Sequence, residues 1–301
     1  MNRVILLFVD GVGIGNIDYN ANPFFKYGFK TFEKLFNAIP STENNVLENG
    51  GYFIFPTDAI LGVAGLPQSG TGQTSIFCGV NAPKIIGQHF GPYPYSTLVP
   101  IIKEQNIFKY FIEKNNSVSF VNAYPKLFFD YVGSGKRRLS VTTLSCTLNK
   151  MRLNRVTDLK KGNAISAEIT NEIWKSKLNY NLRVIKPETA ARRLLRISEK
   201  HQFTVYEFFL TDHLGHGRNT ELLESTIREL DQFLYTIFTE FNKKDTTIIL
   251  CSDHGNFEDI SIKSHTLNPA LTMSAGRNSR VVFESVKDIS QIKQKIIELT
   301  E

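Results

Sequence analysis

Continuous apolar runs alternate along this chain with segments of helical periodicity. Arg3–Val9 and Thr246–Cys251 are apolar runs rich in branched residues, a pattern typical of strands that are buried on both faces. Residues 203–210 show the same pattern with one polar interruption. Shorter runs at residues 117–121 and 279–283 predict two further strands.

Helical spacing of apolar residues separates these runs. It predicts helices at residues 98–114 and 188–200, the second of which begins just after Pro187. The longest predicted helix covers residues 222–241 and carries one apolar stripe. Strands that alternate with helices favour an α/β fold, in which a mostly parallel central sheet has helices on both faces.

An acidic residue follows each of three predicted strands. Asp10 comes directly after the first strand, Asp212 follows the strand at residues 203–210, and Asp253 follows the strand at Thr246–Cys251. Functional residues of such sheets gather beyond the carboxyl ends of the strands. We therefore expect these three carboxylates to converge, although they are far apart in the sequence.

The charge of the chain is unevenly distributed. The formal net charge is +6, yet residues 130–200 alone hold 16 Lys and Arg against 6 Asp and Glu, which leaves the remainder slightly acidic. Together with weak periodicity, this excess predicts a small basic cap at residues 125–187, inserted into a core formed by residues 1–124 and 188–301. A basic cap suits an anionic substrate, although a solvated face or a nucleic acid partner would give the same pattern.

The remaining composition points to a reduced, non-membrane protein. Cys78, Cys146 and Cys251 form no paired spacing, so we expect free thiols. The first apolar stretch is too short for a signal peptide, and no stretch is long enough to span a membrane. The sequence therefore predicts a cytoplasmic location.

Short cassettes of metal-binding residue types occur at the predicted strand ends. Asp212 and His216 are separated by three residues, Asp253 and His254 are adjacent, and His265 follows on a polar loop. Each cassette alone is a weak signal. Together with Asp10, they supply enough carboxylates and imidazoles for two divalent cations.

A candidate nucleophile lies in the loop Gln-Ser-Gly-Thr-Gly-Gln that contains Ser69. Gly70 and Gly72 let the backbone approach a phosphate, and a helix start after them would stabilise its charge. A hydroxyl at this place can be ionised by a metal and attack phosphorus. Thr71 is a rival nucleophile, and an ordinary helix-capping loop is the alternative reading.

The order and the residue identities of these motifs resemble those of the alkaline phosphatase superfamily. They are most similar to the motifs of the cofactor-independent phosphoglycerate mutases and phosphopentomutase. The resemblance rests on Val-Asp10-Gly-Val-Gly, Asp253-His-Gly-Asn-Phe-Glu258 and His265-Thr-Leu-Asn-Pro269. The spacing around Ser69 matches the nucleophile loop of that family, which favours Ser69 over Thr71. The resemblance covers the core and implies an alkaline-phosphatase-like three-layer sandwich.

The resemblance also implies the roles of the site residues. One metal would be held by Asp10, Ser69, Asp253 and His254, and the other by Asp212, His216 and His265. Ser69 would attack in line and form a phosphoserine. The implied cofactors are two Mn²⁺ or Zn²⁺ ions, since nitrogen and oxygen ligands suit both. Candidate substrate contacts are Gly70, Thr71, Gln73 and His89.

The sequence departs from the mutases in ways that concern the substrate. Gln73 replaces a histidine of the family loop, and the short cap replaces a large substrate domain. We expect phosphoryl transfer on a small phosphate ester, and the short cap favours a phosphatase over a phosphomutase. Alternatives are a phosphodiesterase or phosphonate hydrolase of the same superfamily, and a non-catalytic, metal-stabilised module that binds an anionic partner. We expect neither a membrane nor a nucleic acid partner.

Overall fold

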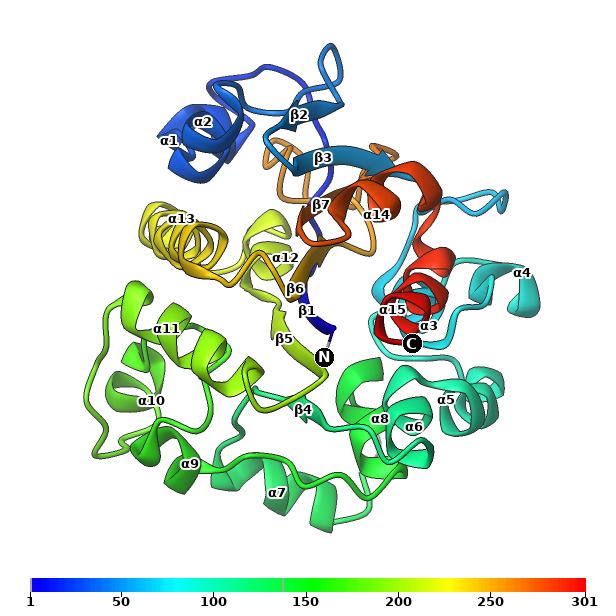
Figure 1. The fold of residues 1–301 in the computed structure, drawn as a ribbon, viewed down its shortest axis with the longest axis vertical. Helices are drawn as coiled ribbons and strands as arrows, with labels where there is room; N and C mark the ends of the chain where they lie inside the picture. The colour runs from blue at the N-terminus through cyan, green and yellow to red at the C-terminus, as the bar shows by residue number, and fades with distance from the viewer. Residues whose placement is uncertain (1, 137) are drawn as a thin grey trace.

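A seven-stranded sheet forms the centre of the computed structural model, which describes residues 2–136 and 138–301 (Figure 1). The strand order is β2-β3-β7-β6-β1-β5-β4. Strands β6, β1, β5 and β4 are parallel, whereas β7 is antiparallel to β6 and β3, and β2 is antiparallel to β3. The strands are β1 (Arg3–Val9), β2 (Leu47–Asn49), β3 (Tyr52–Thr57), β4 (Val118–Phe120), β5 (Phe203–Phe208), β6 (Thr246–Cys251) and β7 (Ala270–Gly276).

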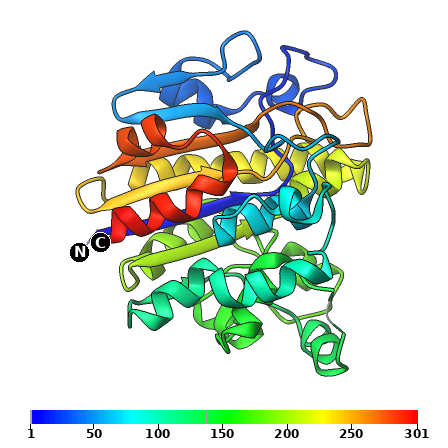
Figure 2. The ribbon, with the colours of Figure 1, turned by 90° about the vertical axis from the view of Figure 1, so that its right-hand side faces the viewer.

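Helices cover both faces of the sheet (Figures 1 and 2). One face carries α1 (Pro23–Tyr27), α2 (Lys30–Phe36), α11 (Pro187–Ser198) and α13 (Leu223–Glu240). The other carries α3 (Ser69–Cys78), α4 (Ala82–Ile86), α5 (Val99–Gln105), α6 (Ile107–Glu113), α8 (Val141–Leu148), α14 (Ser279–Ser285) and α15 (Ile292–Thr300). The remaining elements are α7 (Lys126–Gly133), α9 (Val156–Lys161), α10 (Glu172–Ser176), α12 (Leu210–Gly215) and the short 3₁₀ helices η1 (Ser96–Leu98), η2 (Thr220–Leu222) and η3 (Ile289–Gln291).

The alternation of side chains along β1 explains the three layers. Ile5 and Leu7 pack into the hydrophobic core on one face, whereas Leu6 and Phe8 pack into the core on the other. A strand covered on both faces needs apolar residues at every position, which is the pattern in the sequence. The predicted three-layer α/β fold with a mostly parallel centre is therefore confirmed.

Two sequence-based assignments need correction. The predicted strand at residues 279–283 is helix α14, because Val282 and Val286 are buried at helical spacing against the sheet. The predicted helix at residues 98–114 is two helices, α5 and α6. Asn106 separates them, and its side chain accepts a hydrogen bond from the backbone N–H of Lys109, as an N-cap does.

The residues 125–187 contribute to the cores on both faces of the sheet and also form a small cluster of their own. Ile165, Ile169 and Ile185 belong to the core on the α13 face. Helix α8 belongs to the main core on the α3 face of the sheet. A separate small cluster, made by Leu159, Ala164, Trp174 and Leu182 with Ala123, lies around α9 and α10. The division of the chain into a core and a cap at residues 125 and 187 stays a prediction.

The two termini lie side by side at the edge of the sheet where β1 begins (Figures 1 and 2). Cys78, Cys146 and Cys251 are buried free thiols, as expected. Within the described residues, no helix combines the length and apolar character that crossing a membrane requires.

Candidate metal centre

The carboxyl ends of three neighbouring strands bring the predicted acidic residues together. Strands β6, β1 and β5 are adjacent and parallel, so their carboxyl ends share one edge of the sheet. Asp10 directly follows β1, and Asp253 comes two residues after β6. Strand β5 ends earlier than predicted, at Phe208, so Asp212 lies in the first turn of helix α12.

The first cluster surrounds the Nε2 atom of His254. The Oγ atom of Ser69, which is the first residue of α3, lies 3.0 Å from this nitrogen. Asp10 Oδ1 and Asp253 Oδ2 lie 3.4 Å and 3.5 Å from the same nitrogen. All four residues are buried. Four potential ligand atoms therefore meet at one point.

This arrangement differs from a catalytic triad. In a triad the carboxylate orients the ring nitrogen that faces away from the serine. Here Asp10 and Asp253 approach the same nitrogen of His254 as Ser69 does, while Nδ1 faces the carbonyl oxygen of Gly255 at 3.4 Å. Convergence of oxygen and nitrogen acceptors on one point is the geometry of a metal site.

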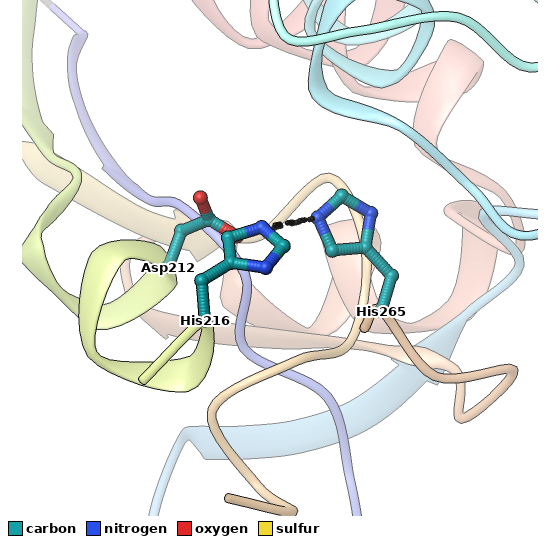
Figure 3. A group of neighbouring side chains, drawn as sticks. All are labelled: Asp212, His216 and His265. Atoms are coloured by element: carbon teal, nitrogen blue, oxygen red, sulfur yellow. Dashed lines mark hydrogen bonds and ion pairs between the residues drawn. The ribbon is translucent and has the colours of Figure 1, made fainter. Parts of the chain in front are cut away.

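The second cluster joins α12 to the loop between β6 and β7 (Figure 3). The Nε2 atoms of His216 and His265 lie 3.1 Å apart, and each is 3.4 Å from Asp212 Oδ1. The Nδ1 atoms face the carbonyl oxygens of Lys263 at 2.8 Å and Pro67 at 2.6 Å. Because Nδ1 must donate to a carbonyl, each neutral imidazole directs the lone pair of Nε2 at its partner and at the carboxylate. A metal cation between these three atoms would stabilise such a group.

Burial strengthens the case for divalent cations. Asp10 Oδ1 and Asp253 Oδ2 are buried and have no hydrogen-bond partner. Burial, followed by the carboxylates of Asp253 and Asp212, raises the pKa of Asp10 well above its ordinary value. Charged groups this close are stable only when a positive charge compensates them. The residues present therefore fit two divalent cations, with Asp212 close to both clusters.

Asp212 has the opposite tendency. Burial alone would raise its pKa, but the rings of His265, His254 and His216, when they are protonated, and the amide of Asn256 hold its pKa below the usual range. The Asn256 side chain donates to Asp212 Oδ1 at 2.7 Å. Asp212 is thus held as a carboxylate, the form that binds metals.

Glu258 ties the three loops of the centre together. Its Oε2 atom accepts hydrogen bonds from the backbone N–H groups of Gly13 and Asn256, both at 2.8 Å. Its Oε1 atom accepts from the Thr266 hydroxyl at 2.5 Å and the Asn268 amide at 3.0 Å. The residues after β1, after β6 and before β7 are therefore fixed to one buried carboxylate.

Close packing fixes the start of α3. A Cβ atom on Gly70 would lie 2.2 Å from the carbonyl oxygen of Tyr93, and one on Gly72 would lie 2.9 Å from the Cβ of Asp253. Only glycine allows the helix to approach these groups. The Thr71 hydroxyl is buried and donates to the carbonyl of Gln68 at 3.1 Å, so it does not face the cluster as Ser69 does.

The other predicted substrate contacts have different surroundings. Gln73 donates to Asp10 Oδ2 at 3.2 Å and accepts from the backbone N–H of Val141 at 3.3 Å, so it orients Asp10. His89 faces the carbonyl of Val63 at 3.1 Å and lines a separate cavity. Gly70, Thr71 and His89 are thus not among the residues that line the cavity at the metal centre.

A cavity of about 480 Å³ opens beside Ser69. Four of the acidic, basic and histidine residues that line this cavity are not among the site residues predicted from the sequence. Arg138 belongs to the basic run at residues 136–138 of the predicted cap, and Arg137 lies outside the described residues. Besides the predicted ligands Asp10, Ser69, Asp212, His216 and His265, and Gln73, the lining includes Arg138, Glu207, His213 and Arg218.

Glu207 is the most unusual of these residues. It is buried in β5, and Thr142 of α8 donates a 2.7 Å hydrogen bond to its Oε2 atom. Burial raises its pKa to about 7. The signal in the sequence was the single acidic residue in an otherwise apolar strand, since a buried carboxyl group without a function is rare.

Comparisons with known proteins show similarity to metalloenzymes in sequence and to an alkaline phosphatase in fold. The family model described as Metalloenzyme superfamily matches residues 152–301. The alkaline phosphatase from the Antarctic bacterium TAB5 has a TM-score of 0.56 at 15% identity, and the match covers 99% of this chain and 98% of that one. The predicted alkaline-phosphatase-like fold and the resemblance to metalloenzymes of that superfamily are confirmed.

Two curated relatives are 2,3-bisphosphoglycerate-independent phosphoglycerate mutases. The Wolinella succinogenes enzyme is 35% identical over 74 residues, which are 25% of this chain and 15% of that protein. The Clostridium botulinum enzyme is 28% identical over 108 residues, which are 33% of this chain and 21% of that protein. The chain therefore matches only a small part of the length of these relatives.

Proposed function

We propose that the protein transfers phosphoryl groups from small phosphate esters, with Ser69 as the nucleophile and two divalent cations as cofactors. One observation carries the proposal. Ser69 Oγ lies 3.0 Å from His254 Nε2, beside two buried carboxylate oxygens that have no hydrogen-bond partner. A purely structural metal site gives no reason for a serine hydroxyl at this point.

The two clusters divide the ligands. One cation would be held by Asp10, Ser69, Asp253 and His254, and the other by Asp212, His216 and His265. When bound, the cations would lower the pKa of the serine hydroxyl and neutralise phosphate oxygens. The mixed nitrogen and oxygen donors suit Mn²⁺ and Zn²⁺.

The chain itself supplies the nucleophile and its orientation. Ser69 begins a ten-residue helix, so the positive end of the helix dipole lies where phosphate oxygens would bind. Attack by Ser69 Oγ forms a bond to phosphorus and breaks the bond to the ester oxygen; the alcohol leaves with a proton, and Ser69 keeps the phosphoryl group. Water then releases inorganic phosphate and restores the serine.

We favour hydrolysis over isomerisation because the mouth of the cavity is open. Arg138, Arg218 and Tyr93 line the cavity and are exposed. A mutase must hold its phosphoenzyme away from water, which requires a closed site. The two mutases named above include long segments that this chain does not match.

A substrate panel tests the proposal. Metal-free protein is supplied with Mn²⁺ or Zn²⁺ and incubated with phosphomonoesters, phosphodiesters and sugar phosphates, while inorganic phosphate and isomerised products are measured. We expect phosphate release from monoesters, none with Ser69→Ala, and retained activity in the matched control Thr71→Val. Isomers without phosphate would indicate a mutase, faster diester cleavage a phosphodiesterase, and full activity of Ser69→Ala would refute the nucleophile.

A further inference from the structure

We propose that the preferred substrate carries a planar aromatic ring in its alcohol part, bound by an aromatic wall of the cavity. This wall consists of Tyr93, Tyr124, Phe128 and Phe209. The inference rests on the proposed function, because it concerns the group that leaves when phosphate is transferred to Ser69.

Four separate segments supply the aromatic wall. Tyr93 comes from the loop before η1, Tyr124 from the residues after β4, Phe128 from α7 and Phe209 from the turn between β5 and α12. A phosphate and its metals require charged and polar partners only. Ligand cavities combine a few polar groups that fix orientation with apolar walls that bind the rest of the ligand. The rings therefore indicate a substrate with an apolar part.

Helix α7 leaves part of its apolar surface exposed, although Phe128, Tyr131 and Val132 also pack partly against the core. The helix has the sequence Lys-Leu-Phe-Phe-Asp-Tyr-Val-Gly, yet none of its residues is buried. Leu127 next to Phe128 is 69% exposed, and Tyr93, which lines the cavity, is 40% exposed. Apolar surface gains free energy when it is removed from water. A ring that covers Phe128 and Tyr93 would provide this gain.

The wall has fixed faces that can select a ring by its shape. The rings of Tyr124 and Phe128 have centroids 4.2 Å apart at 34°. The Tyr124 hydroxyl is 2.7 Å from the Thr143 hydroxyl, and the Phe209 ring lies 5.2 Å from the ring of His213. Aromatic pairs are favourable in offset or edge-to-face geometry beyond the area that they bury. A flat ring can use these faces better than a puckered aliphatic ring of the same size.

The charges at the cavity mouth act on a different part of the ligand. Arg138 and Arg218 are exposed and form no ion pair with any residue that the structure describes. Guanidinium groups bind phosphate oxygens whatever the alcohol is. The arginines therefore provide affinity for all phosphate esters, whereas the aromatic wall provides the preference among them.

Non-hydrolysable phosphonates test the preference without relying on turnover. Binding of benzylphosphonate, cyclohexylmethylphosphonate and methylphosphonate to the metal-loaded protein is measured by calorimetry. We expect benzylphosphonate to bind about fivefold to tenfold more tightly than its cyclohexyl counterpart. Phe128→Leu should lower this ratio, although the other three rings remain, and Phe128→Tyr should retain it. The matched control Arg218→Met should weaken all three ligands and leave the ratio unchanged.

The outcomes separate the two proposals. Equal affinities of the benzyl and cyclohexylmethyl compounds, or a ratio that is unchanged in Phe128→Leu, would overturn the aromatic preference and leave phosphoryl transfer untouched. Absence of turnover on every ester would instead overturn the proposed function. A nucleoside monophosphate, tested on the metal-loaded Ser69→Ala variant, distinguishes the sources of the ring: tighter binding than benzylphosphonate indicates a nucleobase, and weaker binding a ring next to the phosphate.

Discussion

At the scale of single residues, the centre combines groups that oppose each other until a cation is bound. Asp10, Asp212 and Asp253 are buried at one edge of the sheet. Burial and the neighbouring carboxylates raise the pKa of Asp10, and two of the buried oxygens lack partners. Such a site lowers the stability of the metal-free protein in return for affinity to metals.

The first prediction follows for Asp10→Asn. The amide removes one negative charge and can still accept the hydrogen bond from Gln73, which the structure shows at Asp10 Oδ2. We expect the melting temperature of the metal-free variant to exceed that of the wild type. A concentration of Mn²⁺ or Zn²⁺ about a hundredfold above its dissociation constant should stabilise the wild type by about 2.7 kcal/mol and the variant far less. Calorimetric scans with and without a chelator measure both effects; a destabilised metal-free variant would count against this explanation.

Glu258→Gln gives a second prediction at this scale. Each carboxylate oxygen of Glu258 accepts two hydrogen bonds, and a glutamine side chain would place an NH₂ group against two of the four donors. We expect a loss of about 3 kcal/mol in the free energy of unfolding, since buried donors lose their acceptor. Denaturant titration measures the loss, and the exposed Glu43→Gln is the control. A change no larger than in the control would show that the loops do not depend on this carboxylate.

At the scale of elements, strand ends explain why so much of the centre could be predicted. Asp10 and Asp253 follow continuous apolar runs, and parallel neighbours bring such positions together whatever their distance in sequence. Strand β7 was not predicted, because Thr272 and Ser274 are buried in it and interrupt the apolar pattern. Glu207 was missed because one acidic residue in a strand does not reveal which cavity it faces.

The third prediction concerns the contact between α13 and the residues before and within α10. Burial raises the pKa of Glu229 on α13 to about 7 from 4.5, and Glu168 and Glu172 add to this shift. Between about pH 4.5 and 7, the folded protein therefore keeps a proton that the unfolded chain has already lost. The free energy of unfolding consequently falls as the pH rises through that window.

Glu229→Gln should remove this dependence. We expect the variant to match the wild type in stability near pH 4.5 and to exceed it by about 1 kcal/mol at pH 8, a value reduced for solvent screening because the side chain is partly exposed. Melting temperatures over this pH range measure the difference. Glu221→Gln, an exposed change just before the same helix, should show no such trend. Equal pH profiles of wild type and Glu229→Gln would contradict the expectation.

At the scale of the whole molecule, different segments of the chain supply the proposed reaction centre and the residues proposed to select the substrate. The carboxyl edge of the sheet brings together Ser69 and the residues that the sequence motifs predict as metal ligands. The residues 125–187 supply Phe128, Arg138 and Thr143 to the lining of the cavity. The composition of this segment predicted a basic cap. It could not predict which of its side chains line the cavity, because tertiary packing decides that.

The proposed phosphoserine can be trapped by acid quenching during turnover. Metal-loaded protein at saturating phosphomonoester is quenched, digested and mapped by mass spectrometry. We expect a phosphoryl group on the peptide that contains Ser69. This group should be absent after chelation of the metals and in the Ser69→Ala variant. Steady turnover with the phosphoryl group on another residue, or with Ser69→Ala as active as the wild type, would contradict this proposal.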